Sequence, residues 1–236
     1  CYYRESKFLE AYFAYDSVVN THRKVDENLA GDAAYYRYRA ATALFAATRD
    51  RKDEELKKKA RSSFAGEFPK HPRSIDLQYY EGADYIADGD ALMADRQNDK
   101  ATEVYNLALD RLAGVKKSSI LFAKAKARMG EIRYKLKKYA EAQKDFRWVE
   151  KYVVDPDNVT TDQERTANRL QARAIAVYYS STCYRAQERW DEVINRLADY
   201  EANFNQDHVK NFHGPVHSER ISAYIKLAKL DAAEAE

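Results

Sequence analysis

The sequence is poor in glycine and proline, with 7 Gly and 4 Pro among 236 residues. Turns that need a positive φ or a fixed φ are therefore few. This shortage disfavours folds that depend on many tight turns, such as β-sandwiches, barrels and α/β sheets with short loops. Since 45% of the residues are hydrophobic, the chain carries too much apolar material to remain disordered. The composition favours long helices.

Cysteine is also scarce, because only Cys1 and Cys183 are present and they lie far apart in the sequence. No disulfide framework and no CxxC metal site is visible. No apolar run approaches the roughly 18 residues that a membrane span requires, so we expect no membrane-spanning segment. A chain that begins with Cys1 is expected to be processed or cut from a longer protein. A lipoprotein with its lipid on Cys1 is one alternative, and a cytoplasmic, periplasmic or cell-envelope location stays open.

Neither sign of charge is in excess, since 40 Lys and Arg face 38 Asp and Glu for a formal charge of +2. A chain-wide field that would concentrate nucleic acid or anionic lipid is therefore not expected. The segment 116–138 differs, because it holds nine basic residues and one acid, Glu131. It predicts either a surface for an acidic peptide, a lipid headgroup or a nucleic acid strand, or a solvated face whose neighbours supply counter-charge. Nucleic acid is the minor option, because no base-reading element is present.

Apolar residues recur every three or four positions along nearly the whole sequence. This period is that of amphipathic helices, and no segment alternates polar and apolar residues long enough to predict a strand. The pattern predicts an all-α protein with helices over 3–21, 31–48, 53–66, 73–89, 98–114, 118–136, 139–152, 162–187, 190–204 and 216–233.

Short links between these helices favour antiparallel hairpins, and a block of residues recurs along them. In this block Gly130 lies in one helix, and Ala142 and Phe146 follow in the next. The glycine lets the two helices of a hairpin approach, and the aromatic ring fills the gap toward the next hairpin. Because one hairpin cannot bury its apolar faces alone, we expect a stack of hairpins.

The segment 124–156 resembles the tetratricopeptide repeat, with Gly130, Ala142 and Phe146 at the positions of the motif's glycine, alanine and aromatic residue. Pro156 lies two residues past the motif's proline. Degenerate copies surround Ala60, Gly82 and Val193, at shifts of 48 to 51 residues rather than the family's 34. Gly82 and Ala101 are 19 residues apart rather than 12, which predicts an insertion around 90–99.

The resemblance implies an α-solenoid of antiparallel helical hairpins that forms a right-handed superhelix. We expect one repeat domain over residues 1–236, which forms a segment of a longer solenoid. Its expected parts are a leading helix in 1–30, four hairpins in 31–206, and a loop and trailing helix in 207–236.

In the tetratricopeptide family the first helix of each hairpin lines a concave face that binds a partner protein or peptide. The resemblance therefore implies a non-catalytic protein-protein interaction scaffold without a cofactor. Basic residues on this face point to an acidic partner, and tyrosine, with 19 residues, is a type that interfaces favour. Among the carried-over positions we expect Tyr79, Lys124, Tyr178 and Arg185 to contact the partner. The other carried-over positions are Ala83, Ile86, Glu131, Tyr134 and Thr182.

Motifs of catalysis are missing, since the sequence has no GxSxG, no GxxxxGK[ST] and no GxGxxG. The one candidate metal site is a histidine-rich segment, because imidazole and carboxylate groups suit zinc or nickel. A Gly214–Pro215 turn interrupts it, so no single helix presents these groups together, and a polar loop is the competing interpretation. We expect neither an enzyme nor a bound metal. The residues of this segment are His208, His213 and His217 with Asp207 and Glu219.

Two other functions stay open beside the scaffold. One is a structural subunit of a large assembly, or an envelope-associated lipoprotein module. The other is a metal-binding regulatory or enzymatic helical domain built on the His208–His217 segment.

Overall fold

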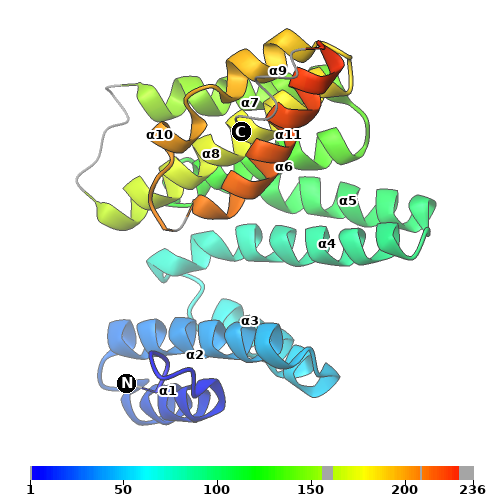
Figure 1. Cartoon of the computed structure of the whole chain (residues 1–236). Coiled ribbons are helices and arrows are strands. Elements are labelled where there is room, and N and C mark those ends of the chain that lie inside the picture. Colours follow the sequence, from blue (N-terminus) through cyan, green and yellow to red (C-terminus); the bar gives the residue numbers. More distant parts are fainter. Residues whose placement is uncertain (1, 156–161, 208, 229–236) are drawn as a thin grey trace. The chain divides into compact units, whose positions relative to one another are not determined.

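The structure is a computed structural model that describes residues 2–155, 162–207 and 209–228 (Figure 1). Within these residues all regular structure is helical and no strand occurs. The elements are α1 (Phe8–His22), α2 (Glu27–Thr48), α3 (Arg51–Glu67), the 3-10 helix η1 (Pro72–Asp76), α4 (Leu77–Ala94), α5 (Asn98–Ala113), α6 (Phe122–Lys135), α7 (Tyr139–Val154), α8 (Gln163–Arg185), α9 (Trp190–Leu197), α10 (Tyr200–Asn203), the 3-10 helix η3 (Lys210–Phe212) and α11 (His213–Lys226).

The predicted all-α class is confirmed, and the helices pack against their neighbours in chain order, as an α-solenoid requires. Some helix ends differ from the prediction. Helix α2 begins at Glu27 rather than at residue 31, because the Asp26 side chain caps it by accepting a hydrogen bond from Leu29 N at 2.9 Å. The helix predicted over 190–204 is two short helices, α9 and α10.

The insertion predicted around 90–99 is wrong. Helix α4 continues to Ala94, and a short turn leads directly into α5. Gly89 does not end α4, because it makes room for the ring of Tyr105. A Cβ atom at Gly89 would lie 2.6 Å from Tyr105 Cε1. The extra residues between Gly82 and Ala101 therefore lengthen the two helices rather than the loop between them.

The chain divides into two compact units, Cys1–Leu77 and Gln78–Glu236. In unit 1, α2 packs against both α1 and α3. Buried alanines of α2, including Ala30 and Ala34, allow this close approach, and Tyr35 fills the remaining space. Arg37 of α2 pairs with Asp16 of α1 at 2.5 Å. The single repeat domain predicted over residues 1–236 stays a prediction.

Unit 2 has three apolar clusters that follow one another along the chain. The first joins α4, α5 and α6 around Tyr105 and Leu112. The second joins α6, α7 and α8 around Phe146 and Val149. The third joins α8 to α9, α10 and α11 around Leu197. Because successive clusters share a helix, the order of the hairpins in the chain is also their order in the stack.

Helix α6 contributes to two clusters, with Met129 in the first and Ala127 in the second. Helix α8 does the same, with Ile175 in the second and Val177 in the third. A helix that packs on two sides needs small or apolar residues around much of its circumference. This requirement explains the alternating buried alanines of α6, which are Ala123, Ala125 and Ala127.

The pairing of small and aromatic residues follows the sequence pattern. A Cβ atom at Gly130 would collide with the ring of Phe146, so the glycine sets the spacing of α6 and α7. The same ring stacks on Tyr179 of α8, with centroids 6.3 Å apart. Phe146 thus links one hairpin to the next, as predicted.

Candidate partner-binding surface

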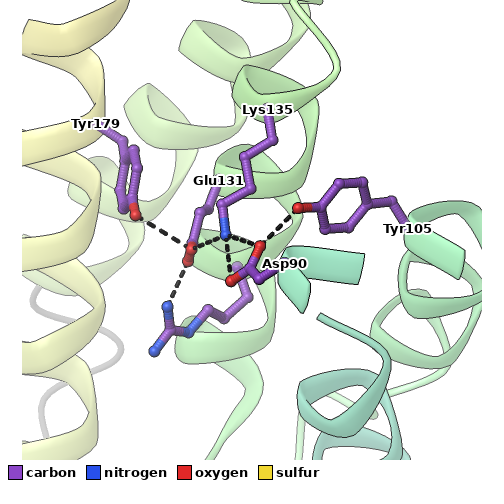
Figure 2. A network of polar contacts seen from close by, with 6 residues as sticks. Asp90, Tyr105, Glu131, Lys135 and Tyr179 are labelled. Atoms are coloured by element: carbon purple, nitrogen blue, oxygen red, sulfur yellow. Dashed lines mark hydrogen bonds and ion pairs between the residues drawn. The ribbon is translucent and has the colours of Figure 1, made fainter. Parts of the chain in front are cut away.

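A buried carboxylate, Glu131, organises the polar face of α6. Glu131 is 3% exposed. Its Oε2 accepts a hydrogen bond from Arg128, and its Oε1 lies 2.9 Å from Lys135 Nζ. The hydroxyl of Tyr179 on α8 donates to the same Oε1 at 3.1 Å (Figure 2). Arg128, Glu131 and Lys135 share a face because they lie three and four positions apart on one helix.

Asp90 extends this network to the preceding hairpin. Lys135 Nζ lies 2.7 Å and 2.9 Å from the two carboxylate oxygens of Asp90 on α4. The hydroxyl of Tyr105 on α5 donates to Asp90 Oδ1 at 2.6 Å (Figure 2). Lys135 thereby joins Asp90 to Glu131, so polar contacts as well as apolar clusters connect α4, α5, α6 and α8.

Burial and pairing set the protonation states in this network. Burial alone would raise the pKa of Glu131, but Arg128 and Lys135 outweigh it and hold that pKa below its ordinary value. Burial raises the pKa of Tyr179, and the Glu131 carboxylate raises it further. Burial and Asp90 raise the pKa of Tyr105 in the same way. At neutral pH Glu131 is therefore an ionised acceptor, and both phenols are donors.

A small pocket of about 110 Å³ lies beside this network. Lys124 and Arg128, one turn apart on α6, supply its positive charge. Lys124 Nζ lies 5.6 Å from the ring centroid of Tyr79, and in the described part of the chain no carboxylate forms an ion pair with it. Arg128 is fixed by Glu131. Burial would lower the pKa of Arg128, but Glu131 and, to a lesser degree, Tyr79 outweigh it and raise that pKa. The lining residues are Lys124, Arg128, Gln171, Ile175, Val209, Asn211 and Phe212.

Arg185 forms a second polar cluster at the end of α8. Its Nη1 lies 3.1 Å from Glu219 Oε1 on α11, and its Nη2 donates to the hydroxyl of Tyr134 on α6 at 3.3 Å. Burial raises the pKa of Glu219, and Arg185 opposes this shift. Burial also raises the pKa of Tyr178, and the Glu219 carboxylate raises it further. Glu219 therefore matches the charge of Arg185, whereas no described carboxylate forms an ion pair with Lys124.

The structure brings the four predicted contact residues together as two pairs. Lys124 lies over Tyr79, and Arg185 lies close enough to Tyr178 to affect its pKa. Phe212 connects the pairs, because it lines the Lys124 pocket and its ring centroid lies 5.1 Å from that of Tyr178. Tyr79 is 6% exposed, so it has little surface for a partner to contact, and its ring mainly packs against Lys124.

The remaining carried-over positions divide by burial. Ile86 and Thr182 are buried in the packing, and Glu131 is the centre of the network. Ala83 and Tyr134 are half-buried. Six of the seven pocket residues were not predicted as contacts, and Arg128 and Phe212 are the instructive cases among them. Arg128 could have been found, because it lies one turn after Lys124 on the same helix face. Nothing in the sequence indicated Phe212, which reaches the pocket from the segment before α11.

The basic segment 116–138 is only partly neutralised in space. Arg128, Arg133 and Lys135 form ion pairs with carboxylates of α4, α6 or α7. The other six basic residues form none with any described residue. The counter-charge interpretation thus holds for these three residues. A binding surface formed by the other six stays a prediction. The six are Lys116, Lys117, Lys124, Lys126, Lys137 and Lys138.

The histidine-rich segment holds no described metal site. His208 lies outside the described residues. His213 Nε2 lies 2.7 Å from the carbonyl oxygen of Phe204, and His217 Nε2 lies 3.5 Å from Glu201. Both histidines therefore dock α11 against α10 and the residue that follows it. No group of three or more His, Cys, Asp or Glu side chains in the described ranges has the geometry to hold a metal ion.

No protein-family model and no curated protein matches this chain. Among the described helices, none combines the length and the apolar character needed to cross a bilayer.

Proposed function

We propose that unit 2 is a non-catalytic module that binds an acidic segment of a partner protein or peptide beside α6 and α8. One observation carries this proposal. Lys124, whose ammonium group has no ion pair among the described residues, lines a pocket together with Arg128. The resemblance to tetratricopeptide repeats supports it, because the first helices of hairpins bind partners in that family.

The pocket suits an amino-acid side chain better than a free inorganic ion. Its charged edge is formed by Lys124 and Arg128, whereas Ile175, Val209 and Phe212 supply apolar surface. In an acidic side chain, the carboxylate would pair with these two cations and the apolar stem would pack against the three apolar residues. Because Glu131 and Tyr79 hold Arg128 in place, the guanidinium needs little reorganisation on binding.

Arg185 and Tyr178 extend the proposed contact along α8. Since Glu219 already pairs with Arg185, we expect Arg185 to contribute less than Lys124. Charge reversal at both Lys124 and Arg185 is expected to weaken an acidic partner, and more strongly at low salt because the charges are then less screened.

Selection from a library of random peptides tests the proposal. The wild-type chain is expected to enrich peptides that contain Asp and Glu. Titration of these peptides should show about tenfold weaker binding to the variant Lys124→Glu. The variant Lys137→Glu is the matched control, because it makes the same charge change at an exposed lysine that also has no described ion pair. Equal affinity for wild type and Lys124→Glu, or an equal loss in the control, would refute the proposal.

A further inference from the structure

Helix α7 carries an exposed stripe of basic residues around a tryptophan. Lys144, Arg147, Trp148 and Lys151 occupy positions i, i+3, i+4 and i+7, which share one helix face. All four are exposed, and Trp148 keeps 39% of its surface exposed although it is large and apolar. An exposed indole among cations is a feature that packing of the hairpins does not require.

Two further rings gather around Trp148. The indole stacks on Tyr152, with centroids 4.9 Å apart and an interplanar angle of 14°. Phe122 at the start of α6 meets both rings edge-on, at 5.6 Å and 5.8 Å. Lysines flank this aromatic cluster. Lys126 Nζ lies 5.9 Å from the Phe122 centroid, and Lys117 Nζ lies 6.0 Å from the Tyr152 centroid.

No described carboxylate pairs with the cations of this patch. Asp145 and Glu150, the acids of α7 that flank the stripe, are paired with Arg133 of α6 and Arg196 of α9. The basic residues of the patch form no ion pair with any described residue. They are Lys117, Lys126, Lys144, Arg147 and Lys151.

The arrangement of the rings decides which anionic partner fits. A single nucleic acid strand would need free ring faces on which its bases could stack. Here Trp148 covers Tyr152, and the Arg169 guanidinium also lies 5.6 Å from the Tyr152 centroid. Base stacking would therefore have to displace packed neighbours. A lipid surface needs no such displacement, because amphipathic rings lie at headgroup level and long lysine side chains reach anionic headgroups.

We propose that this basic aromatic patch, formed by Phe122, Trp148 and Tyr152 with the five cations named above, binds the surface of an anionic lipid bilayer. The contact is peripheral and electrostatic, with Trp148 as the residue that enters the headgroup region. It does not depend on the proposed partner binding, because none of these residues lines the Lys124 pocket. A partner held beside α6 and α8 would then be brought close to a membrane surface.

Sedimentation with vesicles tests this proposal on the full chain. We expect the chain to bind vesicles of three parts phosphatidylcholine to one part phosphatidylglycerol and to remain unbound with pure phosphatidylcholine. Replacing Lys144, Arg147 and Lys151 together by Gln should reduce partitioning roughly a hundredfold, because each basic side chain near an anionic surface contributes about fivefold. The matched control replaces Lys137, Lys138 and Lys226 by Gln, which removes the same charge from exposed positions elsewhere in unit 2.

Fluorescence distinguishes the patch from a general charge effect. The chain has two tryptophans, so the variant Trp190→Phe reports on Trp148 alone. Its emission should shift to shorter wavelength when anionic vesicles are added. An unchanged emission, an equal loss of binding in the control variant, or binding to an oligothymidine strand but not to vesicles would each overturn the proposal.

Discussion

The ammonium group of Lys135 on α6 lies 2.7 Å from a carboxylate oxygen of Asp90 on α4. Lys135 therefore bridges two successive hairpins, because it also pairs with Glu131 at 2.9 Å. A fifth of the Lys135 side chain and about half of the Asp90 side chain are exposed, so water partly screens the bridge.

Replacing Lys135 by Met should destabilise unit 2, because it leaves two carboxylates without their shared cation. Arg128 and Tyr179 still satisfy Glu131, so the expected loss in the free energy of unfolding is about 1–3 kcal/mol. Urea denaturation followed by circular dichroism measures this loss. The control Lys137→Met removes an exposed lysine with no described ion pair and should change stability by less than about 0.5 kcal/mol. Equal effects would show that the bridge is energetically neutral.

Acid should weaken the fold through Glu131. The pKa of Glu131 in the folded chain is below its ordinary value of 4.5, because Arg128 and Lys135 outweigh burial. A lowered pKa means that its contribution is present above about pH 4.5 and is lost as the pH falls through the folded value. The variant Glu131→Gln should be less stable than wild type at pH 7 and should lose less further stability on acidification. Denaturant titrations across acid pH test this.

The exposed Glu103 on α5 provides the comparison, since it forms no described ion pair. The variant Glu103→Gln should keep the acid sensitivity of the wild type. If Glu131→Gln keeps it as well, Glu131 is not its source.

Replacing either of two helical glycines by alanine should change the stability of the protein, but in opposite directions. Gly130→Ala places a Cβ atom against the Phe146 ring and should cost about 1–3 kcal/mol of stability through overpacking. Gly66→Ala in α3 meets no atom within 4 Å and should add up to about 1 kcal/mol, because alanine favours the helix. Thermal or urea unfolding of both variants measures the contrast. A smaller side chain at position 146, in the double variant Gly130→Ala with Phe146→Leu, should restore part of the loss.

Cys183 should be inert in the folded protein. It is buried in the second cluster, and burial raises the pKa of its thiol to about 12. At pH 8 the reactive thiolate is therefore a minor species, and reagents reach it only after the fold opens. In a Cys1→Ser background, labelling by a thiol reagent should be slow in buffer and rapid in urea. Fast labelling of the native chain would contradict this burial.

The Gly130–Phe146 contact could be predicted because both residues belong to one hairpin, where helix period and link length fix which positions meet. The extension of α4 could not, since its cause is a side chain 16 positions later, Tyr105, that fills the space at Gly89. A glycine read alone indicates a helix end as readily as a close contact.

The candidate surface was predictable to a similar degree. Lys124 and Arg185 could be placed on the first helices of hairpins, and the structure shows them on α6 and α8. The sequence did not show that Arg185 has an ion-pair partner while Lys124 has none among the described residues, because the partner of Arg185, Glu219, comes from α11. The same holds for the basic segment, where the counter-charges of Arg128, Arg133 and Lys135 come partly from other helices.

Because α6 and α8 each complete two adjoining clusters, neither can melt without uncovering apolar surface on both sides. Fraying should therefore start from the outermost hairpins of unit 2 and move inward. Any shortened version that ends after α7 would remove the α8 residues of the second cluster and uncover the face of Phe146 that stacks on Tyr179. Removing whole hairpins from this unit should therefore make it prone to aggregation, unless a polar capping helix covers the newly exposed apolar face.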